Sequence, residues 1–173
     1  MAKTVKVVRG SVLTTALYHR LKDDTDIIAG DLVRINNAGE IELASADNTD
    51  GGAVHGIALQ NGGAVATEDG MTLAYGDLFP IAVFNSDTVL AIPLPADDNW
   101  GDMENIGVGT TAVLDVTSGA MTLTDVVADG PVLITGLPSD DQSFDPDQGD
   151  TVDNGYVYCK VPQAVLDGRG DPA

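Results

Sequence analysis

Apolar residues form short runs of Val, Ile, Leu and Thr, which glycine, asparagine and aspartate interrupt at intervals of several residues. The clearest unit covers residues 31–43, where two such runs flank the turn sequence Asn-Asn-Ala-Gly. In the second run Ile41 and Leu43 alternate with Glu40 and Glu42. This alternation has the period of a half-buried strand, and the pattern therefore predicts an antiparallel hairpin.

Similar apolar runs between turn residues predict further strands. They cover residues 54–59, 71–74, 78–84, 88–92, 107–116, 120–124, 131–135 and 156–161. A βαβ fold would need helical runs of about ten or more residues between its strands. The predicted fold class is therefore all-β, a compact barrel or sandwich of short antiparallel strands with an extended N-terminal arm.

Residues 11–22 allow two interpretations. Leu13, Leu17 and Leu21 have the spacing of an amphipathic helix capped by Ser11. The two threonines after Leu13 and the Val-Lys-Val-Val run at residues 5–8 favour an extended arm instead, and we expect the arm.

Charge divides the chain into unequal parts, because 27 acids and 8 bases give a formal net charge of −19. Five bases and no acid lie between Met1 and Lys22, whereas the stretch from Asn36 to Cys159 contains no Lys or Arg. The five bases are Lys3, Lys6, Arg9, Arg20 and Lys22. We therefore predict a basic N-terminal arm (residues 1–24), an acidic β domain (25–165) and a flexible C-terminal tail (166–173).

The composition argues against several classes of protein. Nucleic acid is not an expected partner of so acidic a chain, because phosphate binding needs a basic surface. No apolar run approaches the ~18 residues of a membrane span, and the N-terminus lacks a signal-peptide pattern, so we expect synthesis in the cytoplasm. Cys159 is the only cysteine and the only histidines are His19 and His55, which excludes an intrachain disulfide and argues against a zinc site.

Candidate chemistry is weak. The carboxylates of Asp145, Asp147 and Asp150 suggest a calcium loop, but Gly149 stands where that motif needs a ligand, and a solvated acidic loop is the preferred interpretation. The same holds for the acids around Trp100. Nearly every acid lies among Gly, Asn, Pro or Ser, which predicts exposed carboxylates. With no nucleophile, nucleotide or paired-carboxylate motif, we expect no enzyme, no catalytic or metal site and no cofactor.

Three segments carry a resemblance to a known family. They are Ala29-Gly-Asp-Leu-Val-Arg-Ile35, Gly39-Glu-Ile-Glu-Leu-Ala44 and Gly52-Ala-Val-His-Gly-Ile-Ala-Leu59, preceded by the arm. Over about residues 1–60 this pattern resembles the small β-rich head decoration (cement) proteins of tailed viruses. The resemblance implies a virion protein on the outer surface of the head, often a homotrimer, whose terminal arm joins the major capsid protein.

The resemblance and the charge together predict a non-enzymatic protein that binds and stabilises a capsid. The expected contact residues are the five basic residues of the arm, since they suit an acidic or mixed partner surface. The alternative is a β-rich fibre, turret or receptor-binding module that uses its acidic loops to contact a host surface. So acidic a composition also suits strong salt and hence a halophilic host.

Overall fold

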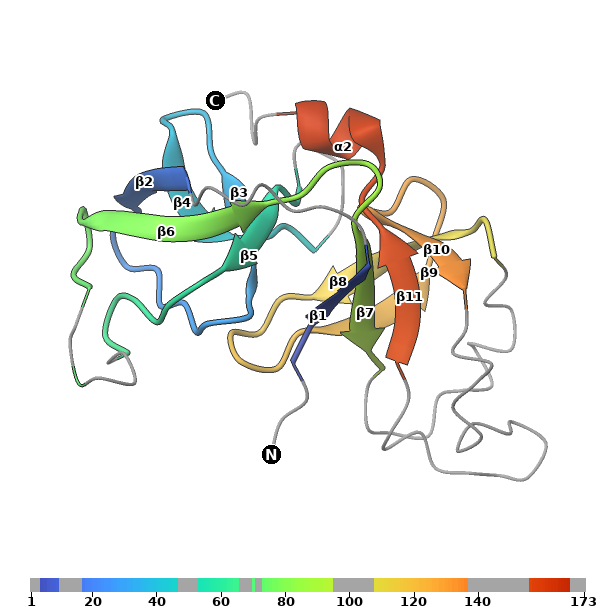
Figure 1. The fold of residues 1–173 in the computed structure, drawn as a ribbon, viewed down its shortest axis with the longest axis horizontal. Helices are drawn as coiled ribbons and strands as arrows, with labels where there is room; N and C mark the ends of the chain where they lie inside the picture. The colour runs from blue at the N-terminus through green and yellow to red at the C-terminus, as the bar shows by residue number, and fades with distance from the viewer. Residues whose placement is uncertain are drawn as a thin grey trace.

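The computed structural model (Figure 1) describes residues 4–9, 17–46, 53–65, 70, 73–94, 108–136 and 156–168. Within these residues the chain forms eleven short strands and one short helix, arranged as a closed barrel beside a six-stranded sheet. The prediction of an all-β fold of short antiparallel strands is confirmed.

Five of the described strands close the barrel in the order β2-β4-β3-β5-β6. They are β2 (Leu17–Leu21), β3 (Leu32–Ile35), β4 (Glu40–Leu43), β5 (Gly56–Ala58) and β6 (Leu78–Val83). All pairs are antiparallel except β2 with β4. Leu21, Ile41, Phe79 and Ile81 fill the interior because each alternates with an outward residue along its strand.

The other described strands form a sheet in the order β1-β7-β11-β10-β8-β9, with every neighbouring pair antiparallel. They are β1 (Lys6–Arg9), β7 (Val89–Pro93), β8 (Thr111–Asp115), β9 (Thr122–Val126), β10 (Val132–Gly136) and β11 (Tyr156–Lys160). The sheet curls so that β9 also lies against β7, and it encloses the larger hydrophobic core. The helix α2 (Gln163–Asp167) follows β11 and buries Val165 in this core.

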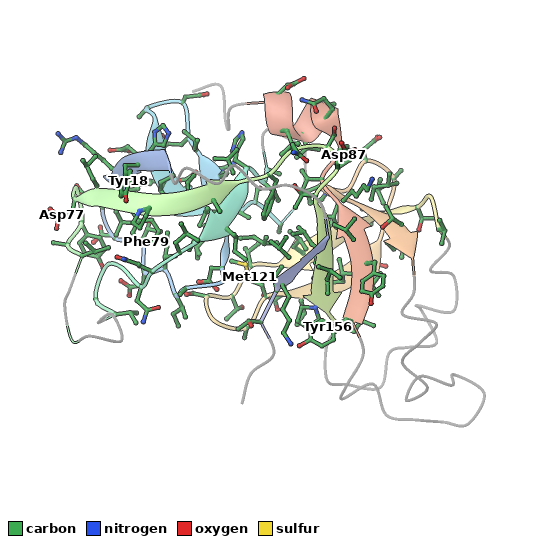
Figure 2. All side chains as sticks on the ribbon, viewed as in Figure 1. Tyr18, Asp77, Phe79, Asp87, Met121 and Tyr156 are labelled. Atoms are coloured by element: carbon green, nitrogen blue, oxygen red, sulfur yellow. The ribbon has the colours of Figure 1, made fainter. Side chains whose placement is uncertain are left out.

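A buried carboxylate joins the barrel to the sheet. Asp31, just before β3, is 3% exposed and accepts hydrogen bonds from Ile28 N (2.9 Å), Ser118 Oγ (2.6 Å) and Gly119 N (2.8 Å). Ser118 and Gly119 lie in the turn between β8 and β9, so this side chain links the two bodies, which also share the larger hydrophobic core through Leu32 of β3. Met121, labelled in Figure 2, adds an N–H···S contact from Leu32 N at 3.1 Å.

Most predicted strands are present, with ends that differ by a few residues. The predicted antiparallel hairpin is formed by β3 and β4, with Val33 opposite Leu43 and Ile35 opposite Ile41. The strand predicted over residues 71–74 is absent from its described part, residues 73 and 74. The tail predicted from residue 166 begins too early, because residues 163–167 are helical and Leu166 packs against the core.

The predicted arm is in part built into the fold. Residues 6–9 and 17–21 are extended, which contradicts the helical alternative over residues 17–21, whereas residues 10–16 lie outside the described residues. However, β2 pairs on both sides within the barrel and buries Leu21, and β1 is the edge strand next to β7. In its described parts, residues 4–9 and 17–24, the predicted arm is therefore built into the sheet and the barrel.

Candidate functional site

The predicted contact residues that the structure describes are divided between the sheet and the barrel. Lys6 and Arg9 belong to β1 of the six-stranded sheet, whereas Arg20 lies in β2 and Lys22 follows that strand in the barrel. Lys3 lies outside the described residues, and only the backbone of Arg9 is described. The lysine at position 6 places its Nζ 5.2 Å from the centroid of the Tyr156 ring.

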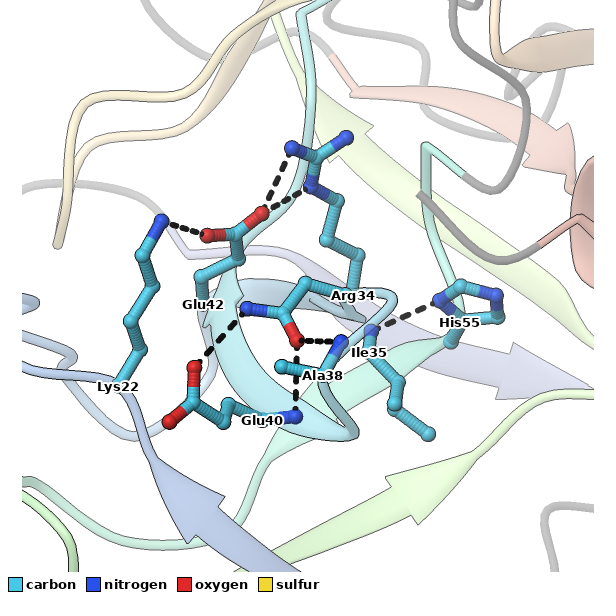
Figure 3. A network of polar contacts seen from close by, with 8 residues as sticks. Lys22, Arg34, Ile35, Ala38, Glu40, Glu42 and His55 are labelled. Atoms are coloured by element: carbon cyan, nitrogen blue, oxygen red, sulfur yellow. Dashed lines mark hydrogen bonds and ion pairs between the residues drawn. The ribbon is translucent and has the colours of Figure 1, made fainter. Parts of the chain in front are cut away.

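The basic side chains of the barrel form hydrogen bonds and ion pairs with other residues of the barrel. Arg20 Nη1 donates a hydrogen bond to the carbonyl oxygen of Gly76 at 2.9 Å. Lys22 Nζ donates to Glu42 Oε2, while Nε and Nη2 of Arg34 each lie 2.6 Å from Glu42 Oε1 (Figure 3). Arg34 and Glu42 are directly opposite each other in the β3–β4 hairpin, which explains why they meet.

Burial and charge act in opposite directions on Glu42, whose side chain is 10% exposed. Burial raises the pKa of Glu42, but the hydrogen bond from Lys22 and the charge of Arg34 outweigh it, and the net pKa is lowered. The carboxylate therefore stays ionised at neutral pH. A general acid needs the opposite shift, so the geometry gives Glu42 a structural role.

An open cavity of about 420 Å³ adjoins this network. Its lining includes Arg34 and Glu42 as well as Asp24, Thr25, Asp26 and Val116. Arg34 Nη1 is buried without a hydrogen-bond partner, but it has almost no accessible surface and so offers no contact to a ligand in the cavity.

Asp26, which lines this cavity, is also held by hydrogen bonds within the protein. Asp26 Oδ1 accepts hydrogen bonds from Ala64 N and Tyr75 Oη, both at 2.7 Å. These bonds lower the pKa of Asp26, the backbone bond most, and the bond to Asp26 raises the pKa of Tyr75. Asp26 and Glu42 both shift downward, so they do not form the split pair of one raised and one lowered acid that hydrolytic chemistry uses.

The remaining candidates for chemistry hold the fold together. His55 is buried, accepts from Ile35 N at 2.9 Å through Nδ1, and contacts the Gly168 carbonyl through Nε2, which assigns the proton to Nε2. His19 Nδ1 lies 3.0 Å from the Gly39 carbonyl. Burial raises the pKa of the Cys159 thiol to about 12, so the thiolate is not populated at neutral pH.

The structure corrects one expectation about the acids. Glu42 and Asp31 are 8% and 3% exposed, although their sequence context predicted solvated carboxylates. The burial of Glu42 could have been predicted from the hairpin register, because that register sets Arg34 opposite Glu42. Asp31 gave no such signal, because its partners Ser118 and Gly119 are 87 and 88 positions away.

Among the described residues, no three His, Cys, Asp or Glu side chains come close enough to hold a metal ion. No described helix is long and apolar enough to cross a membrane. The acidic segment with Asp145, Asp147 and Asp150 lies outside the described residues, as does Trp100.

No protein-family model matches the chain, and no curated protein matches it.

Proposed function

We propose that this chain is a structural, non-enzymatic virion protein that binds the outer surface of a viral capsid and stabilises it. The observation that carries the proposal is the uneven charge on a rigid β scaffold. The net charge is −19, yet five of the eight bases lie between Met1 and Lys22, the segment that supplies β1 and β2. A protein of this kind attaches through a limited cationic region and keeps the rest of its surface acidic.

The outside of the shell is the location that the charge favours. Packaged nucleic acid exposes closely spaced phosphates, and a body of −19 is repelled by them over about 10 Å at ~0.1 M salt. On the outer surface that repulsion is absent. Synthesis in the host cytoplasm followed by attachment to the head agrees with this placement.

The fold supports a structural role because Asp31, Glu42 and His55, which are buried, make contacts within the protein. Asp31 joins the barrel to the sheet, Glu42 pairs with two cations inside the barrel, and His55 connects β3 with the residue after α2. None of these groups is left poised to transfer a proton. The proposed partners are the major capsid protein and further copies of this chain in a trimer.

The trimer has an electrostatic consequence. Three copies bring together bodies of −19 each, and raising salt from ~0.1 M to ~1 M shortens the range of their repulsion from about 10 Å to about 3 Å. We expect self-association, measured by analytical ultracentrifugation, to strengthen as salt rises. Dissociation that grows steadily with salt would contradict this expectation.

Co-sedimentation tests the proposed function. Purified protein is mixed with empty capsids and with intact virions of the virus that encodes it, and an unrelated protein of similar charge serves as the control. We expect saturable binding to both particles and a higher temperature of capsid disruption. Absence of binding to either particle would overturn the proposal, and binding to host cells instead would favour the fibre or receptor-binding alternative.

A further inference from the structure

Four neighbouring strands of the six-stranded sheet contain no acidic residue. The sequences of β1, β7, β11 and β10 are KVVR, VLAIP, YVYCK and VLITG. They carry three bases and no acid in a chain that has 27 acids. The other two strands of the sheet contain Asp115 and Asp125, and barrel strand β4 contains Glu40 and Glu42.

The strand register brings side chains from these strands onto one surface. Lys6 and Tyr158 both pair with Ala91, and Tyr156 pairs with Pro93, so these residues share a face. Lys160 lies two residues beyond Tyr158 and belongs to the same face. The residues that alternate with them, Leu90, Ile92, Val157 and Cys159, are buried in the core.

This surface, which we call the acid-free face, consists of Lys6, Tyr156, Tyr158 and Lys160, which flank the buried Ala91 and Pro93 of β7. In Figure 1, β1, β7 and β11 face the viewer, and no described helix or strand is drawn in front of them. Tyr156 lies at one end of β11 in Figure 2. Lys6 is exposed, and the two tyrosines and Lys160 are half-buried.

We propose that the acid-free face is the surface through which the chain binds its partner, a protein surface that presents carboxylates around apolar side chains. The inference rests on the proposed function and adds which side of the molecule faces the shell. Charge complementarity supports this occupant, because Lys6 and Lys160 attract carboxylates that most of a −19 body repels. Tyrosines contribute contact area at low entropic cost, and they are enriched at the centres of interfaces.

The contact uses side chains instead of strand addition. An exposed edge strand invites pairing with another chain, but short length, a bulge and basic residues oppose it. β1 has four residues, a register shift between Val7 and Arg9, and Lys6 at its start. These features of β1 oppose strand pairing at this edge of the sheet. They do not hinder side-chain contacts on the outer face of the sheet.

The proposal changes the set of expected contact residues. Arg20 and Lys22 leave it, because their charged groups bond to Gly76 and Glu42 within the barrel. Lys160, near the other end of the chain, enters it together with the tyrosines of β11. Lys6 remains.

Cysteine footprinting tests the proposal in the full chain. The only native cysteine, Cys159, is 0% exposed with a pKa of about 12, so it contributes no background to alkylation. The variants Lys6→Cys and Lys160→Cys report on the acid-free face, and Thr124→Cys on exposed β9 is the matched control. Each variant is alkylated with iodoacetamide, alone and after co-sedimentation with capsids.

We expect capsid binding to slow alkylation at positions 6 and 160 by ~10-fold or more, and at position 124 by less than ~2-fold, as for buried and solvent-exposed interface positions. Bound protein with unchanged rates at positions 6 and 160 overturns the acid-free face but leaves the proposed function standing. Wild type that does not bind capsids overturns both. Protection that appears in concentrated protein without capsids assigns the face to a second copy and overturns the proposed partner.

A second pair of variants guards against local damage. Lys6→Gln with Lys160→Gln lowers the net charge by two, as does Thr124→Glu with Ser86→Glu at exposed positions off the face. The first pair is expected to weaken capsid binding ~10- to 100-fold, and the second less than ~3-fold, because only the first removes charges from the contact. Equal weakening by both pairs would overturn the acid-free face, because net charge alone would then govern binding.

Discussion

In the barrel, the β3–β4 hairpin sets Arg34 beside Glu42, which also bonds to Lys22, so these three charged groups pair with one another. In the six-stranded sheet, four adjacent strands contain no acid, and two of them, β1 and β11, place Lys6 and Lys160 on the outer face. Charged residues thus stabilise the fold of the barrel through ion pairs, whereas in the sheet they lie on the outer face. The difference follows from register, because Arg34 is opposite Glu42 whereas Lys6 is opposite Ala91.

The largest effect is expected from deleting the segment from Met1 to Lys22. The deletion takes away β2, which pairs with both β4 and β6 and buries Leu21, so the barrel opens and exposes Phe79. We expect no cooperative unfolding transition by circular dichroism and no dispersed NMR spectrum. Deletion of residues 1–4, which spares buried Val5, is the control and should stay within about 0.5 kcal/mol of the full chain. If the chain without residues 1–22 still folded and unfolded cooperatively, the segment would be a separate arm that the barrel does not need.

The next largest effect is expected from Glu42→Ala. The substitution leaves the guanidinium of Arg34, whose side chain is 16% exposed, without its counter-charge. Breaking a buried ion pair by removing one partner costs about 3–5 kcal/mol, and urea unfolding of the variant would measure the loss. Glu40→Ala on the same strand is the control, because Glu40 makes only a 3.3 Å side-chain contact with Asn36 and should cost about 0.5 kcal/mol. Similar losses for both variants would show that the network adds nothing particular to the barrel.

Local patterns made the hairpin of β3 and β4 predictable, because its two apolar runs are neighbours in the chain and the Asn-Asn-Ala-Gly turn lies directly between them. The closure of the barrel was not predictable, since it depends on the parallel pairing of Arg20 in β2 with Glu40 in β4, and β3 lies between these strands in the chain. The sheet order was hidden for the same reason: β11 inserts between β7 and β10, although β8, β9 and β10 all precede it in the chain. Non-local pairing leaves no periodic signal in the chain.

The candidate sites follow the same division. The burial of Cys159 could be predicted from its apolar strand, and the structure confirms it. The basic residues of the N-terminal segment were visible, but their separation onto two bodies was not, because it depends on which sheet each strand joins. Lys160 could not be connected with Lys6 without knowing that β7 lies between their strands.

The joint between the two bodies is tested by Asp31→Ala. The substitution leaves the half-buried donors Ser118 Oγ and Gly119 N without their acceptor, which costs about 2–4 kcal/mol. We expect the denaturant dependence of unfolding to become shallower as well, because the barrel and the sheet no longer unfold together. Asp31→Asn keeps one acceptor oxygen and should lose about half as much. An unchanged slope in Asp31→Ala would place the coupling in the apolar contacts alone.

Acid should reveal the ion network of the barrel. The folded-state pKa of Glu42 lies below its ordinary value of 4.5, so its stabilisation is complete above that value and is lost as the pH falls through the lower folded pKa. The difference in stability between wild type and Glu42→Gln is therefore expected to be constant from pH 7 to about 5 and to shrink at lower pH. Thermal unfolding across this range measures it. A difference that grows in acid would mean that Glu42 is not the paired group.

The smallest effect on stability is expected on the acid-free face. Lys6→Met removes a cation from above the Tyr156 ring, and at an exposed site such a contact contributes about 0.5–1 kcal/mol at most. Lys22→Met is the matched change in the barrel, where the lost partner of Glu42 is expected to cost about 1–2 kcal/mol even with Arg34 still in place. Urea unfolding of both variants at pH 7 compares their stability.

The two variants should also differ in capsid binding, because Lys6 is proposed to contact the partner whereas Lys22 stabilises the barrel. Lys6→Met is expected to weaken capsid co-sedimentation with little change in unfolding, and Lys22→Met is expected to do the reverse. A loss of stability in Lys6→Met equal to that in Lys22→Met would make the lysine of β1 a part of the fold.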